Sequence, residues 1–222
     1  MERQQAIVIG LGQFGMALAR ALARQGVEVV AVDRRMPQVQ TAADFAVEAL
    51  QLDGMNEDDL SRLRPAERDL CICAIGDDDR EASIVVTTLL RQMGARRVIA
   101  RATDALHERI LHLVGAHEVV MPERNFGERL ATRLAQKKVI DVQALGPDLQ
   151  LTELVAPAAL LGRPLADLRL PQRFRLTLAA VRRKQGGGTT VLSPSADLEL
   201  LPGDVLVVVG PPGTAEELVG GV

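Results

Sequence analysis

The chain has 222 residues, of which 47% are hydrophobic and 25% charged, and its formal net charge at pH 7 is −3. This length allows one domain or two, and the weak negative charge excludes a global basic surface for nucleic acid or anionic lipid. No apolar run approaches the roughly 20 residues that a membrane-spanning helix needs. Because the polar segment MERQQ leads directly into an apolar strand, we expect no signal peptide and a cytoplasmic protein.

The segment IVIGLGQFGMALARALARQGVEVVAVD, residues 7–33, predicts a strand, a glycine-rich turn, a helix and a second strand. In such a turn Gly10 permits the tight bend, Gly12 lets a phosphate approach the backbone, and Gly15 lets the helix pack on the strand. The helix N-terminus offers unpaired N–H groups and a positive dipole end to that phosphate. Asp33 closes the second strand, where a carboxylate accepts hydrogen bonds from ribose hydroxyls. A nucleotide site is favoured over an ordinary βα turn that merely contains three glycines.

The first half of the chain alternates strands and helices. Strands are predicted at 5–9, 28–32, 46–51, 69–75, 97–100 and 118–120. Helices are predicted between them, at 14–25, 36–43, 56–63, 79–93 and 104–113, with one more at about 124–137. Strands joined by right-handed helical crossovers predict an α/β fold, a Rossmann-like parallel six-stranded sheet. Its ligand crevice is expected beyond the carboxyl ends of the strands.

From about residue 138 the glycine and proline content rises and the strands become short. The segments VQALG, LQLTELVA, LTLAAVRRK, TTVLS and DVLVVVG are typical of strands, and LLGRPLADLRLP of a short helix and turn. The glycines at 186–188 are expected to form a hairpin turn. The sequence therefore predicts a nucleotide-binding domain at 1–122, a linker helix at 123–137 and a small α+β C-terminal domain at 138–222.

The residues that an enzyme would need are scarce. A nicotinamide dehydrogenase needs a proton donor or acceptor beside its substrate, but Tyr is absent and the only histidines, His107, His112 and His117, precede the second domain. Their spacing of five residues does not place them on one helical face. Cys71 and Cys73 share one face of a predicted strand, where burial as small apolar residues is favoured over metal binding. We therefore expect a protein that is not an enzyme and has no catalytic residue.

Four segments resemble a known family: IVIGLGQFGMALARAL, LCICAIGDDDREAS, VIARATDALHERILHLVGAHEVVMPERNFGERLA and the terminal LLPGDVLVVVG. They are similar to the cytoplasmic gating subunits of the Trk/Ktr potassium uptake systems, the regulator-of-potassium-conductance proteins, over nearly the whole chain. The resemblance implies dimers that assemble into an octameric ring under a membrane-embedded potassium transporter dimer. Nucleotide exchange would change the shape of the ring and so open or close the pore.

The resemblance also implies a site for ATP or ADP, with NAD(H) as another possible ligand. The cofactor-binding residues that it implies are Gly10, Gly12, Gln13, Phe14, Gly15, Asp33, Arg34, Asp53, Ile75, Gly76, Asp77, Arg101, Ala102, Thr103, His107 and Glu123. Glu123 would in addition help bind a divalent cation, Mg²⁺ or Ca²⁺, near the terminal phosphate at the dimer interface. The simpler alternative is an acid favoured at a helix N-terminus after Pro122.

One residue departs from the family pattern. Gln13 stands where Ktr-type relatives often carry an Arg that meets the terminal phosphate of ATP bound to the neighbouring subunit. Gln has no charge and no bidentate fork, so the preference among ATP, ADP and NAD(H) stays open. Some relatives also bind cyclic di-AMP between paired C-terminal domains. Here Leu165, Leu168 and Leu170 would frame that ligand, or else form the core of a small domain.

The helix at about 124–137 carries Phe126, Leu130 and Leu134 on one stripe. It either crosses to the neighbouring subunit, as the resemblance implies, or packs on its own sheet. Together these observations indicate a nucleotide-binding regulatory subunit of a potassium uptake system. An NAD(P)-dependent oxidoreductase or redox sensor is the alternative, and a structural module with an empty pocket is a third.

Overall fold

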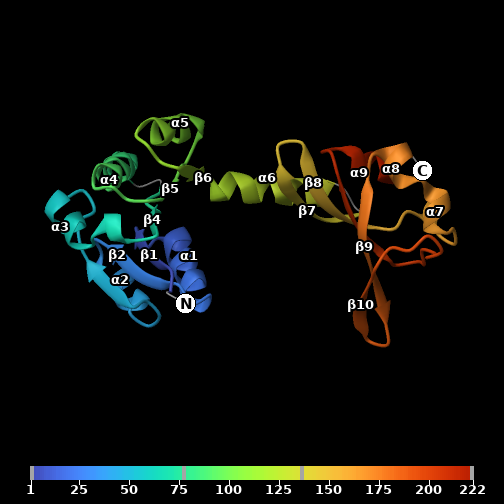
Figure 1. Ribbon diagram of the computed structural model, residues 1–222, viewed down its shortest axis with the longest axis horizontal. Helices are drawn as coiled ribbons and strands as arrows, with labels where there is room; N and C mark the ends of the chain where they lie inside the picture. The colour runs from blue at the N-terminus through green and yellow to red at the C-terminus, as the bar shows by residue number, and fades with distance from the viewer. Residues whose placement is uncertain (1–2, 77–78, 136–137, 221–222) are drawn as a thin grey trace. The chain divides into compact units, whose positions relative to one another are not determined.

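The computed structural model describes residues 3–76, 79–135 and 138–220. The chain divides into two compact units, Met1–Arg124 and Asn125–Val222. Each unit has a hydrophobic core of its own. Figure 1 shows the course of the chain through both units.

The first unit is built on a six-stranded sheet with the order β3-β2-β1-β4-β5-β6. All neighbouring strands pair in parallel, which confirms the predicted Rossmann-like sheet. The strands are β1 (Gln5–Ile9), β2 (Glu28–Asp33), β3 (Glu48–Gln51), β4 (Leu70–Cys73), β5 (Val98–Arg101) and β6 (Glu118–Val120). The helices are α1 (Gln13–Arg24), α2 (Met36–Ala42), α3 (Glu57–Arg62), α4 (Arg80–Gln92) and α5 (Ala105–Leu113), and α6 (Pro122–Ala135) follows β6.

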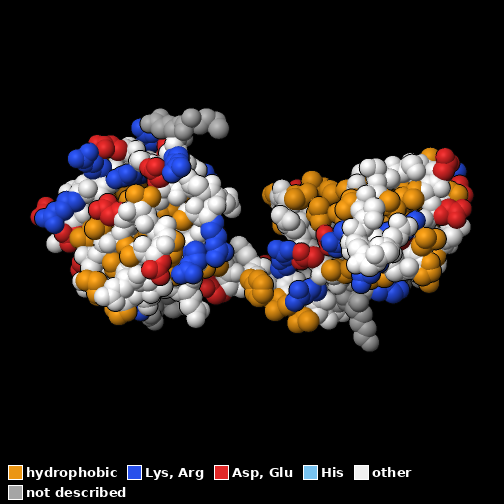
Figure 2. All heavy atoms as spheres, turned by 90° about the horizontal axis from the view of Figure 1, so that it is seen from below, with side chains coloured by type: hydrophobic (Ala, Val, Ile, Leu, Met, Phe, Trp, Pro, Cys, Tyr) orange, Lys and Arg blue, Asp and Glu red, His pale blue; other side chains and the backbone are white. Residues whose placement is uncertain are grey.

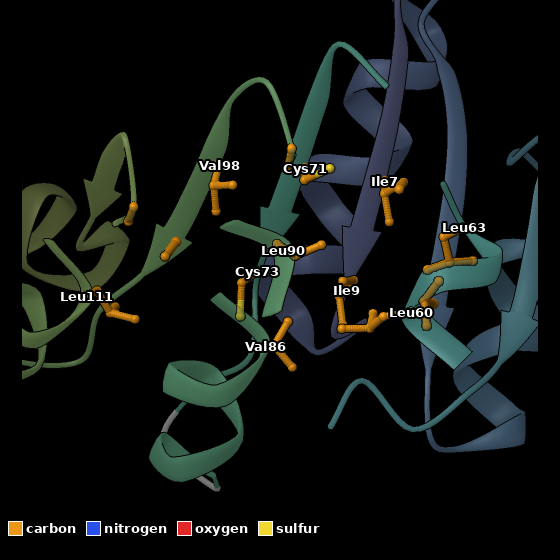
Figure 3. Packing of buried hydrophobic residues seen from close by; sticks show 14 of the residues in the cluster. Ile7, Ile9, Leu60, Leu63, Cys71, Cys73, Val86, Leu90, Val98 and Leu111 are labelled. Atoms are coloured by element: carbon orange, nitrogen blue, oxygen red, sulfur yellow. The ribbon is translucent and has the colours of Figure 1, made fainter. Parts of the chain in front are cut away.

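Helices cover both faces of this sheet, because successive residues of a strand point to opposite sides. On one face Ile7 and Ile9 of β1 pack in a cluster with Val86 of α4 and other side chains of α3 and α5. Figure 3 shows this cluster from close by. On the other face Ala6 and Val8 of β1 pack in a cluster with side chains of α1 and α2. The chain order reverses between β1 and β4, so the ligand crevice of this fold is expected there.

The two cysteines of β4 lie on the same face, as predicted. Cys71 and Cys73 are both free and buried in the cluster that contains α4. Burial raises the pKa of the Cys71 thiol to about 12 and also raises the pKa of Cys73. Both thiols are therefore protonated at neutral pH and serve as small apolar side chains.

Two local features differ from the sequence-based expectation. The helix expected to begin at 124 begins at Pro122. Proline is favoured in the first turn of a helix because the N–H groups there have no partner within the helix, so the missing N–H of proline costs no hydrogen bond. The predicted end of this helix, residue 137, lies outside the described residues. A short 3₁₀ helix, η1 (Pro65–Glu67), precedes β4 and follows Arg64, which has a left-handed φ of 52°.

The second unit is a five-stranded antiparallel sheet with the order β10-β9-β11-β8-β7. Its strands are β7 (Val139–Gly146), β8 (Leu149–Val155), β9 (Thr177–Gln185), β10 (Gly188–Leu192) and β11 (Val205–Gly210). Its short helices are η2 (Ala158–Leu160), α7 (Leu165–Leu168), α8 (Leu170–Phe174) and α9 (Thr214–Gly220). This confirms the small α+β domain. The hairpin turn predicted between β9 and β10 is present, with φ of 57° at Gly186 and 84° at Gly187.

The core of the second unit includes residues that the family resemblance places near cyclic di-AMP. Leu168 and Leu170 are buried among other side chains of this core, and Leu165 packs against it. The packing therefore favours the second of the two alternatives, a structural core. Other hydrophobic side chains, such as Leu145 and Val191, are exposed, and Figure 2 shows hydrophobic side chains on the surface of this unit.

An ion pair joins β9 to the turn before β11. The Nε and Nη2 atoms of Arg183 donate to the two carboxylate oxygens of Asp204 at 2.9 and 2.7 Å. The backbone N–H of Leu201 donates to the same carboxylate at 2.8 Å, and Asp204 is buried. The Arg183 guanidinium holds the pKa of the Asp204 carboxyl below its ordinary value. This pair fixes the LLPGD turn against the sheet.

Candidate functional site

A cavity of about 290 Å³ opens at the carboxyl ends of the strands in the first unit, near the lower end of the usual size range of ligand sites. It lies where the chain order reverses between β1 and β4, as expected for this fold. Most of the residues implied by the family resemblance line it: Gly10, Gly12, Gln13, Phe14, Asp33, Arg34, Asp53, Ile75, Gly76, Arg101 and Glu123.

The glycine loop between β1 and α1 forms one wall of the cavity. Gly10 has a φ of 91°, and a Cβ there would lie 2.9 Å from the backbone N of Ile75. A Cβ on Gly15 would lie 1.9 Å from the carbonyl oxygen of Gly10, so α1 can approach the loop only at a glycine. A Cβ on Gly12 would meet nothing within 4 Å. Gly10 and Gly15 are thus required by the fold, whereas Gly12 leaves open space.

The N-terminus of α1 faces this open space. Gly12 is its N-cap residue and makes no side-chain cap, and the first turn contains no acidic residue. The N–H groups of a first helical turn have no partner within the helix, and the helix dipole adds partial positive charge. This end of α1 can therefore bind a phosphate or another anion.

Asp33, at the end of β2, is buried and braces the glycine loop. One carboxylate oxygen accepts a hydrogen bond from the backbone N–H of Leu11 at 2.7 Å. The other accepts from the backbone N–H of Arg35 at 2.8 Å and from its Nε at 3.3 Å. This carboxylate therefore fixes the loop to the end of β2, in addition to the ribose contact that the sequence predicts for it.

Two other acids that line the cavity also accept backbone hydrogen bonds. Asp79 caps α4, because one carboxylate oxygen accepts from the backbone N–H of Ala82 at 3.0 Å. Its other oxygen accepts from Nη1 of Arg34 at 3.1 Å, in a pair that is too exposed to add much stability. Asp53 accepts from the backbone N–H of Met55 at 3.0 Å, which closes the turn after β3.

Arg101, at the end of β5, lies on the β4 side of the cavity. Its Nη2 donates to Oε1 of Glu123 at 2.6 Å, and its side chain is 12% exposed against 61% for that of Glu123. A Cβ on Gly76 would lie 2.2 Å from Nη1 of Arg101, so the guanidinium rests directly on the Gly76 backbone. The Cζ atom is also 5.9 Å from the centre of the Phe14 ring. The loop after β4, the first turn of α6 and the first turn of α1 therefore hold the Arg101 guanidinium in place.

Four of the residues implied by the resemblance lie outside the lining of the cavity, and a fifth, Asp77, lies outside the described residues. Gly15 is buried under the glycine loop. Ala102 is fully buried, and its N–H donates to a backbone carbonyl of β6 at 2.9 Å. His107 is buried too, and its Nδ1 accepts from the backbone N–H of Thr103 at 3.4 Å. These side chains are used for packing and for the first turn of α5.

The cavity is also lined by residues that are not among those implied by the family resemblance. They are Ile9, Arg35, Leu52, Gly54, Met55, Ala74, Asp79 and Ala82. Asp79 could have been found from its position as a helix N-cap at the carboxyl end of a strand. The apolar members carry no such signal, because their side chains look like ordinary core residues.

Within the described ranges, no group of three or more His, Cys, Asp or Glu side chains is arranged to hold a metal ion. None of the three histidines lines the cavity. His117 precedes β6, and its Nδ1 accepts from the backbone N–H of Val98 at the amino end of β5, 2.8 Å away. No described helix combines the length and the apolar character that crossing a bilayer requires.

The chain is similar to potassium uptake proteins over 94% of its length. It is 34% identical over 208 residues to Ktr system potassium uptake protein A of Vibrio alginolyticus, which covers 94% of this chain and 93% of that protein. It is 33% identical over 208 residues to Ktr system potassium uptake protein C of Bacillus subtilis strain 168, with 94% and 92% covered.

Solved structures show the same fold. The GsuK RCK domain has a TM-score of 0.66 at 21% identity and covers 99% of this chain and 48% of its own. The GsuK channel bound to NAD has a TM-score of 0.65 at 21% identity and covers 99% and 40%. This chain thus spans less than half of those longer chains.

Two family models match the two units. The TrkA-N domain matches residues 6–122, and the TrkA-C domain matches residues 151–219. With the similarity to the Ktr proteins over 94% of its length, the chain belongs to the family of TrkA-N and TrkA-C domain proteins that includes the Ktr system potassium uptake proteins.

Proposed function

We propose that this protein is a nucleotide-binding regulatory subunit of a Ktr- or Trk-type potassium uptake system, which controls ion flow through a membrane-embedded partner from the cytoplasmic side. The observation that carries the proposal is the open N-terminus of α1 at the cavity, with clear space above Gly12. A phosphate placed there would meet unpaired N–H groups and no acidic residue in the first turn. The relatives of similar length are named as potassium uptake proteins.

The ligand is proposed to be an adenine nucleotide, ATP or ADP, and NAD(H) is the alternative ligand. Its ribose would lie at the ends of β2 and β3, beside Asp33 and Asp53, both of which line the cavity. Gln13 lines the cavity without a charge, so it supplies no ion pair to a third phosphate. The GsuK channel has been solved with NAD bound, which makes the dinucleotide a ligand to test.

The proposal includes a divalent cation at Glu123. Among the described residues the only carboxylate proposed for it is Glu123, which is already paired with Arg101. Glu123 alone does not form a cation site, because Mg²⁺ or Ca²⁺ takes about six or more oxygen ligands. Phosphate oxygens and a second copy of the chain would have to supply the rest.

A regulatory role suits the side chains that line the cavity better than an enzymatic one. Among the described residues, the carboxylates that line it are Asp33, Asp53, Asp79 and Glu123, and each accepts a hydrogen bond from a backbone N–H or an arginine. They are thus engaged in holding loops, a helix cap and an ion pair. The alternative, an NAD(P)-dependent oxidoreductase or redox sensor, needs a group poised for proton transfer beside the nicotinamide.

The domain limits proposed for this function are 1–122, 123–137 and 138–222. They are supported by the TrkA-N match, which ends at 122, and by the division into compact units after Arg124. The chain is proposed to form dimers that assemble into an octameric ring. Cyclic di-AMP at the second unit is not part of the proposal, because the leucines implied for it lie in or against the core.

Isothermal titration calorimetry of the purified chain with ATP, ADP and NADH, each with and without Mg²⁺ or Ca²⁺, tests the proposal. We expect adenine nucleotides to bind. A strengthening of ATP binding by the cation, without a similar effect on ADP, would support the role of Glu123. Binding of NADH alone, with oxidation of NADH in the presence of a substrate, would instead support the enzyme.

A further inference from the structure

The cavity of the first unit has two halves of different character. In a sheet of this order each half binds one mononucleotide of a dinucleotide, on either side of the point where the order reverses. The half beside β1, β2 and β3 contains the glycine loop, Asp33 and Asp53. The other half lies at the ends of β4 and β5, where Gly76 and Arg101 are found.

The guanidinium of Arg101 occupies the surface of this second half. It rests on Gly76, since a Cβ on that glycine would lie 2.2 Å from Nη1 and 3.0 Å from Cζ. Glu123 holds it there through the 2.6 Å ion pair. The Arg101 side chain is only 12% exposed, so it is packed in place rather than extended into solvent.

We propose that Arg101, held by Glu123, restricts this site to mononucleotides by covering the half of the cavity where the second nucleoside of a dinucleotide would lie. The proposal rests on the proposed nucleotide-binding function and specifies its ligand. The adenosine half stays open, and the terminal phosphates of ADP end near the positive guanidinium. The second ribose and the nicotinamide of NADH would have to displace it and break its ion pair with Glu123.

The size and the charge of the cavity agree with this assignment. The volume of about 290 Å³ lies near the lower end of the range of ligand sites, which agrees with a smaller ligand. An arginine beside the phosphates favours the extra charge of a terminal phosphate in ADP over the diester-like diphosphate of NADH. Arg101 therefore acts as a specificity-determining residue through both its volume and its charge.

The test compares ADP with NADH, which share an adenosine diphosphate moiety, by isothermal titration calorimetry in the absence of divalent cations. We expect the wild-type chain to bind ADP more tightly than NADH by about tenfold or more. Arg101→Ala should raise the ratio of the NADH to the ADP association constant by about tenfold. Glu123→Gln keeps the positive charge of Arg101 but removes its ion pair with Glu123, so it should raise the same ratio.

Arg97→Ala is the matched control. Arg97 directly precedes β5 and pairs with Glu118, the first residue of β6, at 2.8 Å. It therefore forms an exposed arginine–glutamate pair at the amino ends of these strands, away from the cavity. It should leave the ratio unchanged. Thermal unfolding by circular dichroism establishes that each variant is folded, and Glu123→Gln provides the second variant.

The outcomes separate this inference from the proposed function. It is overturned if the wild type binds NADH as tightly as ADP, or if ADP binds and neither Arg101→Ala nor Glu123→Gln changes the ratio. If neither ADP, ATP nor NADH binds the wild type, the proposed function itself fails. A ratio that rises in both variants and stays constant in Arg97→Ala supports the assignment.

Discussion

At the scale of single residues, the glycine loop contains one glycine that the fold requires, Gly15, and one that the proposed ligand requires, Gly12. A methyl group on Gly15 would collide with the carbonyl of Gly10 at 1.9 Å, whereas one on Gly12 would meet no protein atom within 4 Å. The same substitution at these two positions should therefore have different effects. This contrast provides a matched pair of variants within one turn of the chain.

Gly15→Ala is expected to lower the free energy of unfolding by about 1–3 kcal/mol, because the helix and the loop must move apart. Gly12→Ala should change it by less than about 1 kcal/mol, yet lower the affinity for ADP by about tenfold, since its methyl group fills the phosphate position. Urea unfolding followed by circular dichroism and calorimetric titration measure the two effects. Wild-type affinity in Gly12→Ala would show that the phosphates do not lie on this loop.

Asp33 offers a second prediction at this scale. Both of its oxygens accept backbone hydrogen bonds, from Leu11 and from Arg35. In Asp33→Asn one of these N–H groups would face an amide donor instead of an acceptor. We expect the nucleotide-free variant to lose about 1–3 kcal/mol of stability.

The exposed Asp53 provides the control for this change, since it accepts one hydrogen bond in a surface turn. Asp53→Asn should lose less stability than Asp33→Asn. Equal unfolding free energies for Asp33→Asn and the wild type would mean that the carboxylate serves only the ligand and does not brace the loop.

At the scale of elements, the pair of Arg183 with Asp204 links β9 to the turn before β11. Because the folded-state pKa of Asp204 lies below its ordinary value of 3.8, the pair adds stability above about pH 4. That stability is lost as the pH falls from there through the folded-state pKa. Asp204→Asn should therefore destabilise the second unit at pH 7 by about 3 kcal/mol and remove part of its acid sensitivity.

Hydrogen exchange of β9 and β11 in the whole chain, followed by mass spectrometry at pH 7, reports on this unit directly. Faster exchange in Asp204→Asn is expected. Asp197→Asn, at an exposed carboxylate in the same loop, should exchange like the wild type. Unchanged protection in Asp204→Asn would mean that the turn is held by backbone contacts alone.

Most elements could be predicted from the sequence because their signals are local. The apolar runs and the glycine spacing around residues 7–33 indicate β1, α1 and β2 without reference to the rest of the chain. The pairing of Arg101 with Glu123 could not be predicted in this way. These residues are 22 positions apart on β5 and α6, and their approach depends on the parallel register of β5 with β6, in which Arg101 lies opposite Val120.

At the scale of the whole molecule, the proposed regulation involves several copies of the chain in one ring. A ligand shifts an assembly between two shapes only by the difference in its affinity for them. Repeating the same contact around a closed ring adds these differences, so a modest preference at each site is amplified. The proposed function therefore depends on surfaces that are exposed in the single chain.

The helix α6 carries such a surface. Phe126 is 66% exposed and Leu134 is 71% exposed, although they lie on the stripe that the sequence predicts to be apolar. Covering them by a second copy would remove large apolar side chains from water. We expect the double variant Phe126→Asp/Leu134→Asp to give a species of lower mass than the wild type by light scattering after size-exclusion chromatography.

The variant Val191→Asp is the control for this prediction, because Val191 of β10 is also 66% exposed but lies outside α6. Val191→Asp should keep the wild-type mass if the α6 stripe is a specific interface. It should lower the mass if any exposed apolar side chain contributes to association. A double variant that is folded by circular dichroism and retains the wild-type mass would contradict the prediction. In that case α6 would not hold the copies together, and coupling between nucleotide sites would have to pass through other contacts.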